Sequence, residues 1–201
     1  MSKLGETMKT LCITGGIATG KSLVTKHLKS KGFSVIDADQ ITHELLKDSN
    51  VLNEIKEQFS EAFTHDKLDK SKLAQMIFSD TTKKETLDGI MHKKVYESIF
   101  ERLENHQSES LVAVDIPLLY ETNHQHLFDY IVVVSTSRDI QLKRLMNRNQ
   151  LTKKEALDRI NAQMDLSEKT ALADFVIDNS GSVEHTYEQV NHILNKLKKE
   201  V

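Results

Sequence analysis

The chain has 201 residues, of which 38% are hydrophobic and 28% charged, and a formal net charge of −3. This length is enough for one α/β domain with a sizeable core, or for one domain with an insertion. The negative charge argues against nucleic acid as a partner, and the single cysteine, Cys12, excludes an internal disulfide and a cysteine-rich zinc site.

The apolar runs and the N-terminus predict a cytoplasmic protein without a membrane partner. No apolar run is long enough for a spanning helix, and the N-terminus lacks the apolar core of a signal peptide. Residues 1–8 are polar and are expected to form a short flexible lead. We expect a monomer or a weak homo-oligomer.

The first predicted strand leads directly into a phosphate-binding loop. Residues 10–14 are short, apolar and β-branched, and the pattern G-x-x-x-x-G-K-S/T follows. A helix is expected next, because Val24 and Leu28 lie four residues apart and Gly32 stands where a helix would end. The loop residues expected to bind nucleotide phosphates are Gly15, Gly16, Ile17, Ala18, Thr19, Gly20, Lys21 and Ser22.

Each part of this loop has a chemical role. The glycines let backbone N–H groups approach phosphate oxygens, and the helix N-terminus adds the positive end of its dipole. The Lys21 ammonium is expected to reach the β- and γ-phosphates of ATP, and the Ser22 hydroxyl to bind Mg²⁺. A glycine-rich turn that carries Lys and Ser by chance is the alternative, but the strand–loop–helix setting disfavours it.

A second strand, residues 33–37, runs into two acidic residues at the start of a helix that reaches about residue 47. Asp39 is expected to take the proton of an acceptor hydroxyl or to orient that hydroxyl, and Asp37 is the other candidate. Capping of the helix is the alternative role for both acids. His43 is included on the substrate side, although a surface or core position is the simpler interpretation for every histidine here.

The stretch from residue 48 to about residue 107 is predicted to be helical throughout. Apolar residues recur there at helical spacing, and one long helix is expected from about Thr81 to His106. The one break with turn character lies at residues 64–67, and no strand is expected.

Three further strands are predicted at residues 111–115, 130–135 and 174–178. Helices are expected at 138–147, 153–165 and from Val183 to Leu197. The alternation predicts a five-stranded parallel sheet flanked by helices, with ligands at the carboxyl ends of its strands. Gly15, Asp37 and Asp115 each lie at such an end; Asp115 resembles an acid that holds a Mg²⁺-bound water, or is a turn residue before Pro117.

Basic residues gather in the second half of the chain. Arg144 and Arg148 lie four residues apart and therefore share one helix face. A run of this kind is usually a solvated helix face, so its charges alone do not establish a phosphate site. The residues concerned are Arg138, Lys143, Arg144, Arg148 and Arg159.

Several of these motifs, taken in order, resemble the dephospho-coenzyme A kinase family. The resemblance covers nearly the whole chain from Met8. The phosphate loop is common to many proteins, whereas the other signatures at this spacing are far more specific. They are Asp37-Ala38-Asp39, Asp115-Ile116-Pro117-Leu118-Leu119-Tyr120-Glu121, the stretches 141–148 and 159–163, and residues 173–181.

The resemblance implies a nucleotide-kinase-like P-loop core that transfers the γ-phosphate of ATP to the 3′-hydroxyl of dephospho-CoA, the last step of coenzyme A synthesis. It implies a core at 9–39, 108–143 and 173–201, a helical substrate domain at 40–107 and a lid at 144–172. The proposed base of the family maps onto Asp39. The other implied roles are the acceptor side for Pro117, Leu118, Leu119 and Glu121, the phosphate clamp for Arg144 and Arg148, and the adenine end for Asn179 and Gly181.

Two positions depart from the family pattern. Ala18 stands where many members have glycine, which costs little if its φ is negative, and Lys93 follows His92 where a proline is usual. Two other functions remain as alternatives. Another small-molecule kinase, acting on a nucleoside monophosphate, shikimate or gluconate, leaves residues 115–121 unexplained, and a nucleotide switch would need a water-positioning residue that we do not find.

Overall fold

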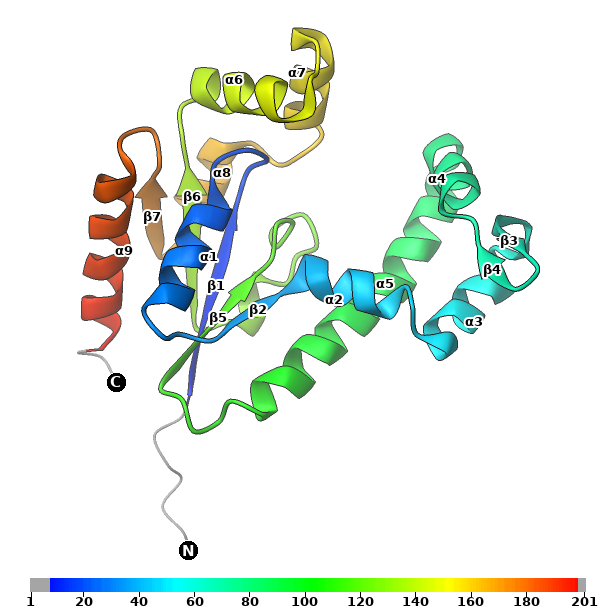
Figure 1. Cartoon of the computed structure of the whole chain (residues 1–201), viewed down its shortest axis with the longest axis horizontal. Helices are drawn as coiled ribbons and strands as arrows, with labels where there is room; N and C mark the ends of the chain where they lie inside the picture. Colours follow the sequence, from blue (N-terminus) through cyan, green and yellow to red (C-terminus); the bar gives the residue numbers. More distant parts are fainter. Residues whose placement is uncertain (1–7, 199–201) are drawn as a thin grey trace, which may run out of the picture. The chain divides into compact units, whose positions relative to one another are not determined.

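The computed structural model describes residues 8–198, so the lead expected at residues 1–8 lies outside the described residues except for Met8. The chain divides into two compact units (Figure 1). The core unit comprises the chain up to Asp37 and from Leu103 onward, and the inserted unit comprises Ala38–Arg102.

The core unit is built on a parallel sheet of five strands in the order β2-β5-β1-β6-β7. Its central strands are apolar and almost fully buried, as a parallel sheet covered on both faces requires. The predicted five-stranded parallel sheet is therefore confirmed. The strands are β1 (Lys9–Gly15), β2 (Val35–Asp37), β5 (Leu111–Asp115), β6 (Tyr130–Ser135) and β7 (Phe175–Asp178).

Helices α1 and α9 lie side by side in the core unit, blue and red in Figure 1. Val24 and Leu28 of α1 and Val190 and Leu194 of α9 pack in one buried cluster with strand residues such as Ile13. Burying these side chains supplies most of the stabilising free energy on that face. The helices of this unit are α1 (Lys21–Ser30), the 3₁₀ turn η2 (Gln125–Leu127), α6 (Arg138–Asn149), α7 (Lys153–Asn161), α8 (Leu166–Ala171) and α9 (Val183–Leu197).

The helix expected at residues 153–165 is two helices in the structure. Helix α7 ends at Asn161, and the Asp165 side chain accepts a hydrogen bond from the Ser167 N–H to cap a new helix, α8. This carboxylate therefore belongs to the start of α8 and not to the end of α7. Cys12 is fully buried in β1, and burial raises the pKa of its thiol well above the ordinary value, which keeps it protonated and inert.

The inserted unit packs around its own apolar cluster, centred on Val51, Ile55, Phe59 and Met91. Helix α5 runs unbroken through His92 and Lys93 and extends two residues beyond this unit. The elements are α2 (Ala38–Leu45), α3 (Ser49–Gln58), the 3₁₀ turn η1 (Ser60–Ala62), β3 (Phe63–Thr64), β4 (Lys67–Leu68), α4 (Lys70–Ser79) and α5 (Thr81–Glu104).

The expectation that this stretch contains no strand was wrong. Strands β3 and β4 form a two-stranded antiparallel hairpin at the predicted turn. His65 and Asp66 have φ values of 50° and 64°, and positive φ at both central residues is the geometry that a two-residue hairpin prefers. Within residues 8–198, no helix combines the length and apolar character needed to cross a bilayer.

Candidate nucleotide-binding site

The phosphate-binding loop connects the carboxyl end of β1 to the N-terminus of α1. Gly20 precedes the helix with φ 94°, in the left-handed region that favours glycine. Ala18, which stands where many members of the family have glycine, also has a positive φ, 60°. The low cost expected for a negative φ at this position therefore does not apply. The left-handed conformation costs an L-residue about 1 kcal/mol, which is stored in the loop.

Two glycines of the loop have no room for a side chain. A Cβ on Gly15 would lie 2.5 Å from the Val134 carbonyl oxygen, and a Cβ on Gly20 would overlap the Asn179 amide nitrogen. The Thr19 hydroxyl closes the turn by donating to the Gly16 carbonyl at 2.9 Å. The loop backbone is therefore tightly packed and curved, the conformation in which backbone amides can point at a phosphate.

Lys21 and Asp115 form an ion pair at the carboxyl ends of the two adjacent strands β1 and β5. Both side chains are largely buried, with 17% and 9% of their surfaces exposed. The pairing holds the ammonium beside the loop. A bound nucleotide would give this ammonium phosphate oxygens as alternative partners.

The residues present suit a magnesium ion that is bound mainly through water and phosphate. Ser22 lies exposed in the first turn of α1, and Asp115 offers a carboxylate one strand away. Residues 8–198 contain no group of three or more His, Cys, Asp or Glu side chains that would form a complete metal cage. Mg²⁺ uses one or two protein oxygens, keeps several waters and takes the rest of its ligands from the substrate's phosphates, so this sparse donor set fits it.

Asn179, which follows β7, is tied to the phosphate loop. Its side-chain amide donates to the Thr19 carbonyl at 2.7 Å, and its side-chain oxygen accepts from the Thr186 hydroxyl at 2.9 Å. The Arg144 guanidinium donates to the backbone carbonyls of Thr19 and Asn179, at 3.4 and 3.0 Å. A Cβ on Gly181, by contrast, would meet only the His185 ring, at 3.8 Å. The structure therefore brings Arg144 and Asn179 to the end of the loop nearest α1.

The two arginines predicted to share one helix face have different surroundings. Arg148 is exposed, and its Nε donates to Asn149 Oδ1 at 2.9 Å. It lies one helical turn beyond Arg144, in the last turn of α6. The structure thus brings only Arg144 to the loop.

The predicted acids divide between the two units. Asp37 ends β2 and pairs in register with Asp115 of β5, which places two carboxylates at one edge of the sheet. Asp39 belongs to the inserted unit, in the first turn of α2, and is exposed. Because α2 begins at Ala38, Asp39 does not occupy the residue before the helix, so the capping alternative does not apply to it. The His43 ring lies 2.7 Å from the Asp39 carbonyl oxygen, within the same helix.

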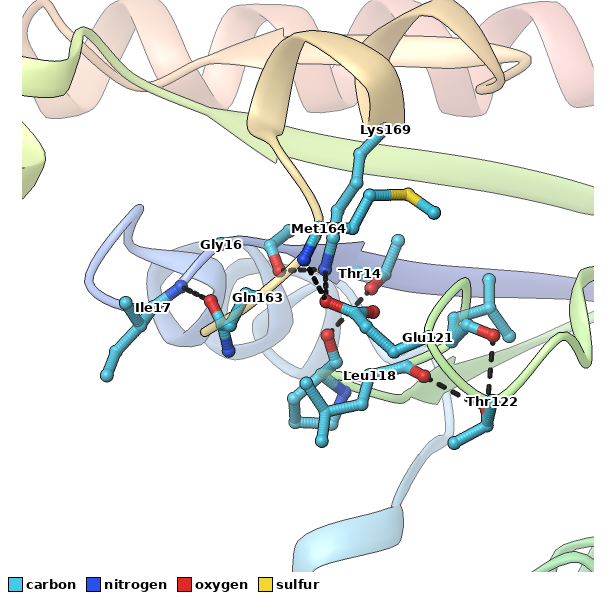
Figure 2. A network of polar contacts seen from close by, with 12 residues as sticks. Thr14, Gly16, Ile17, Leu118, Glu121, Thr122, Gln163, Met164 and Lys169 are labelled. Atoms are coloured by element: carbon cyan, nitrogen blue, oxygen red, sulfur yellow. Dashed lines mark hydrogen bonds and ion pairs between the residues drawn. The ribbon is translucent and has the colours of Figure 1, made fainter. Parts of the chain in front are cut away.

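The segment after β5 contains both exposed and buried members of the predicted acceptor side. The Pro117 carbonyl accepts from the Thr14 hydroxyl at 3.2 Å, and Leu118 is 41% exposed. Leu119 is fully buried, so it anchors the segment to the protein interior. Glu121 forms an ion pair with Lys169 at 2.7 Å and accepts from the Met164 N–H at 3.1 Å (Figure 2).

Three side chains that contact the loop had no assigned role. Gln163 Oε1 accepts from the Ile17 N–H at 2.7 Å, and Gln141 Nε2 donates to the Ile17 carbonyl at 2.8 Å. Lys169 donates to the Gly15 carbonyl at 3.3 Å. Gln163 belongs to the signature stretch 159–163, and this was the sequence feature that could have indicated a functional role for it. No local pattern marks Lys169 as buried.

Comparison with known proteins agrees with this geometry. A family model described as dephospho-CoA kinase matches residues 9–185. Curated dephospho-CoA kinases of Oceanobacillus iheyensis and Listeria monocytogenes are 43% and 41% identical to the chain, covering 92% and 95% of it and 95% and 98% of their own lengths.

Solved structures lead to the same family. A Thermus thermophilus crystal structure has a TM-score of 0.85 at 31% identity, covering 95% of this chain and 98% of that one. Dephospho-CoA kinase from Campylobacter jejuni has a TM-score of 0.73 at 29% identity, with the same coverage. An Acinetobacter baumannii shikimate kinase, at 15% identity and a TM-score of 0.54, shares the fold alone. The loop, the two acids at the sheet edge and the matches over nearly the full chain lead to one conclusion: this chain belongs to the dephospho-CoA kinase family.

Proposed function

We propose that this protein transfers the γ-phosphoryl group of ATP to the 3′-hydroxyl of dephospho-CoA, giving coenzyme A and ADP. The observation that carries the proposal is the phosphate loop, with Lys21 beside Asp115, in a chain whose family match spans residues 9–185. The core at 9–39, 108–143 and 173–201 holds ATP, residues 40–107 bind dephospho-CoA, and residues 144–172 act as the lid. The setting is the cytoplasm, with the protein as a monomer or weak homo-oligomer.

The residues share the work of a phosphoryl transfer, which consists mainly of positioning and charge stabilisation. Backbone N–H groups of residues 15–22 and the Lys21 ammonium hold the phosphates, while Asn179 and Gly181 lie at the adenine end. Arg144 and Arg148 supply positive charge from the lid. Mg²⁺, held by Ser22 and through water by Asp115, neutralises the charge of the phosphate oxygens.

The acceptor contacts are those that the family pattern assigns to this chain. Asp39 takes or orients the proton of the 3′-hydroxyl, and Asp37 and His43 are further substrate contacts. Pro117, Leu118, Leu119 and Glu121 shape the acceptor pocket. A loose transition state needs little help from a base, so orientation by Asp39 would suffice.

Acceptor specificity tests the proposal. ADP formation from ATP and Mg²⁺ is measured with dephospho-CoA, nucleoside monophosphates, shikimate and gluconate at equal concentrations. Rapid turnover with dephospho-CoA alone is expected. A preference for any other acceptor would contradict the assignment, and slow hydrolysis that is insensitive to every acceptor would favour a nucleotide switch.

The role of Asp39 is tested by Asp39→Asn. We expect kcat to fall by about two to four powers of ten, the usual contribution of a positioned acid or base, while ATP affinity is kept. Kinetics and calorimetry on the same preparation separate the two quantities. Unchanged turnover with weakened ATP binding would show that Asp39 serves the nucleotide instead.

A further inference from the structure

Lys169 is a buried cation whose role the proposed mechanism does not use. Its side chain extends from α8 toward Glu121 with none of its surface exposed (Figure 2). The ammonium lies 2.7 Å from Glu121 Oε1 and donates to the Gly15 carbonyl at 3.3 Å. Its charge is thus shared between a carboxylate and the first residue of the phosphate loop.

Glu121 extends this contact to the segment that follows α7. The same oxygen, Oε1, accepts from the Met164 N–H at 3.1 Å. One residue earlier, Gln163 accepts from the Ile17 N–H at 2.7 Å, and Figure 2 shows its side chain reaching the loop. Residues 163–169 therefore hold the loop at Gly15 directly through Lys169 and at Ile17 directly through Gln163.

Fold stability alone gives a weak reason for a buried lysine at this position. Desolvating an ammonium and a carboxylate costs about as much as their attraction returns, and well-packed apolar residues are often at least as stable. What an apolar side chain cannot supply is a hydrogen bond that fixes the direction of the Gly15 carbonyl. That carbonyl lies in one planar peptide group with the Gly16 N–H, so a rotation of the carbonyl would also redirect this amide of the loop.

We propose that Lys169 is a positioning residue for the nucleotide site: by holding the Gly15 carbonyl, with Glu121 as its counter-charge, it sets the phosphate loop in the conformation that binds the phosphates of ATP or ADP. The inference rests on the proposed function only in taking the loop as the nucleotide site. It requires no contact between Lys169 and the nucleotide.

Substitutions of Lys169 and Glu121 can separate an effect on stability from an effect on ADP binding. A purely structural ion pair would change both together. Lys169→Met keeps the length of the side chain but leaves Glu121 without its counter-charge, so both stability and ADP binding should fall. In the double variant Lys169→Met/Glu121→Gln, no buried charge is left uncompensated, and the amide oxygen introduced by Glu121→Gln can still accept from the Met164 N–H. The double variant should therefore regain thermal stability but not ADP affinity.

The experiment is calorimetric titration of the folded proteins with ADP and Mg²⁺, together with thermal unfolding. We expect the Kd for ADP to rise about tenfold, equivalent to about 1.4 kcal/mol, in both the single and the double variant. Lys9→Met is the matched control, because it breaks the Lys9–Asp129 pair at the other end of β1, and its ADP affinity should equal that of the wild type. If Lys169→Met fails to fold, the double variant decides alone.

Recovery of wild-type ADP affinity in the double variant would overturn the proposal, because the lysine would then only neutralise Glu121. Wild-type affinity in folded Lys169→Met would overturn it equally. A wild-type protein that binds no ADP would refute both this inference and the proposed function. A wild-type protein that binds ADP but does not phosphorylate dephospho-CoA would refute the assigned acceptor, while weak binding by the variants would still support the role of Lys169.

Discussion

Gly20 and Gly32 have the same left-handed backbone conformation but differ in the space available for a side chain. Both have positive φ, 94° and 87°, yet a Cβ on Gly20 would overlap Asn179, whereas nothing lies within 4 Å of a Cβ on Gly32. We expect Gly32→Ala to cost about 1 kcal/mol of stability and to leave ADP binding intact. Gly20→Ala should cost more and should abolish ADP binding.

Urea unfolding and ADP calorimetry on both variants test this comparison. Loss of ADP binding in Gly20→Ala but not in Gly32→Ala is the expected result. Equal effects of the two substitutions on stability and binding would mean that the fit between the loop and Asn179 has no special importance.

Lys21 provides the second test at the scale of a residue. Lys21→Ala removes the ammonium assigned to the β- and γ-phosphates, so turnover is expected to fall by about two to three powers of ten, as when a fixed charge donor is lost. The fold should remain, although the ion pair between Lys21 and Asp115 is lost and stability declines. Lys26→Ala, exposed on the same helix, is the control. Normal turnover by a folded Lys21→Ala protein would refute the assignment.

The loop could be predicted from the sequence because its residues are contiguous and its pattern is local. The signature stretches 141–148 and 159–163 include Gln141 and Gln163, but their contacts with the loop could not be predicted. Gln141, Gln163 and Lys169 lie 124, 146 and 154 residues from the loop atoms they bond. Nothing in the local sequence of α8 distinguishes a buried lysine from a solvated one. The positive φ of Ala18 could not be predicted either, because alanine ordinarily adopts a negative φ.

At the scale of elements, α5 contains an exposed glycine, Gly89, within its 24-residue length. Nothing lies within 4 Å of a Cβ at this position. Gly89→Ala should therefore raise the free energy of unfolding by about 1 kcal/mol, because alanine loses less backbone entropy than glycine in a helix. Urea unfolding checks the sign, which should be opposite to that of Gly32→Ala. A destabilised Gly89→Ala protein would contradict it.

Asp129, the residue just before β6, is hydrogen-bonded to the beginning of β1. It accepts from the Thr10 N–H and hydroxyl, both at 2.9 Å, and from Lys9 at 3.2 Å. Burial alone would raise the pKa of this carboxyl, but the hydrogen bonds from Thr10 and Lys9 outweigh it and lower the pKa. A lowered folded pKa gives stability that is present above the unfolded pKa of about 3.9 and is lost as pH falls through the folded value.

Asp129→Asn should therefore be less stable than the wild type near neutral pH, and the difference should close as pH falls below about 4. Urea unfolding of both proteins between neutral and acidic pH measures the difference. A gap that does not change with pH would mean that the ionised carboxylate contributes nothing beyond the shape of the side chain.

The five sheet strands could be predicted because each is a short apolar run with β-branched residues. In the central strands β5 and β6, burial on both faces selects that composition. Strands β3 and β4 have only two residues each, too few for any periodicity. The break between α7 and α8 was missed because the apolar spacing continues across it, while the cap at Asp165 depends on a side chain that also fits a helix.

At the scale of the whole molecule, the sheet order explains why the site lies where it does. Strand β1 is central, with β5 on one side and β6 on the other, so the loop after β1 is flanked by the segments that follow both neighbours. Ligands of open parallel sheets bind at such a point. Asp115 is the last residue of β5, and Glu121 and Arg144 come from the segments that follow β5 and β6.

The proposed lid at residues 144–172 should close unevenly along its length. Residues 163–169 are already bonded to the loop, whereas the turn at Gln150 between α6 and α7 is exposed. We expect ATP and dephospho-CoA together to slow hydrogen exchange most in the α6–α7 turn and least at 163–169. Exchange followed by mass spectrometry tests this pattern, and equal exchange at 144–162 with and without substrates would argue against a lid.

The proposed reaction is the transfer of a phosphoryl group, held by the loop at residues 15–22, to a ribose hydroxyl. The most direct measurement follows the label from ATP that carries isotopically marked γ-phosphate oxygens, with dephospho-CoA and Mg²⁺, and locates it by mass spectrometry and phosphorus NMR. One labelled phosphoryl group on the 3′-oxygen and a product identical to coenzyme A are expected. Label found only in inorganic phosphate, or on an acceptor other than dephospho-CoA, would contradict it.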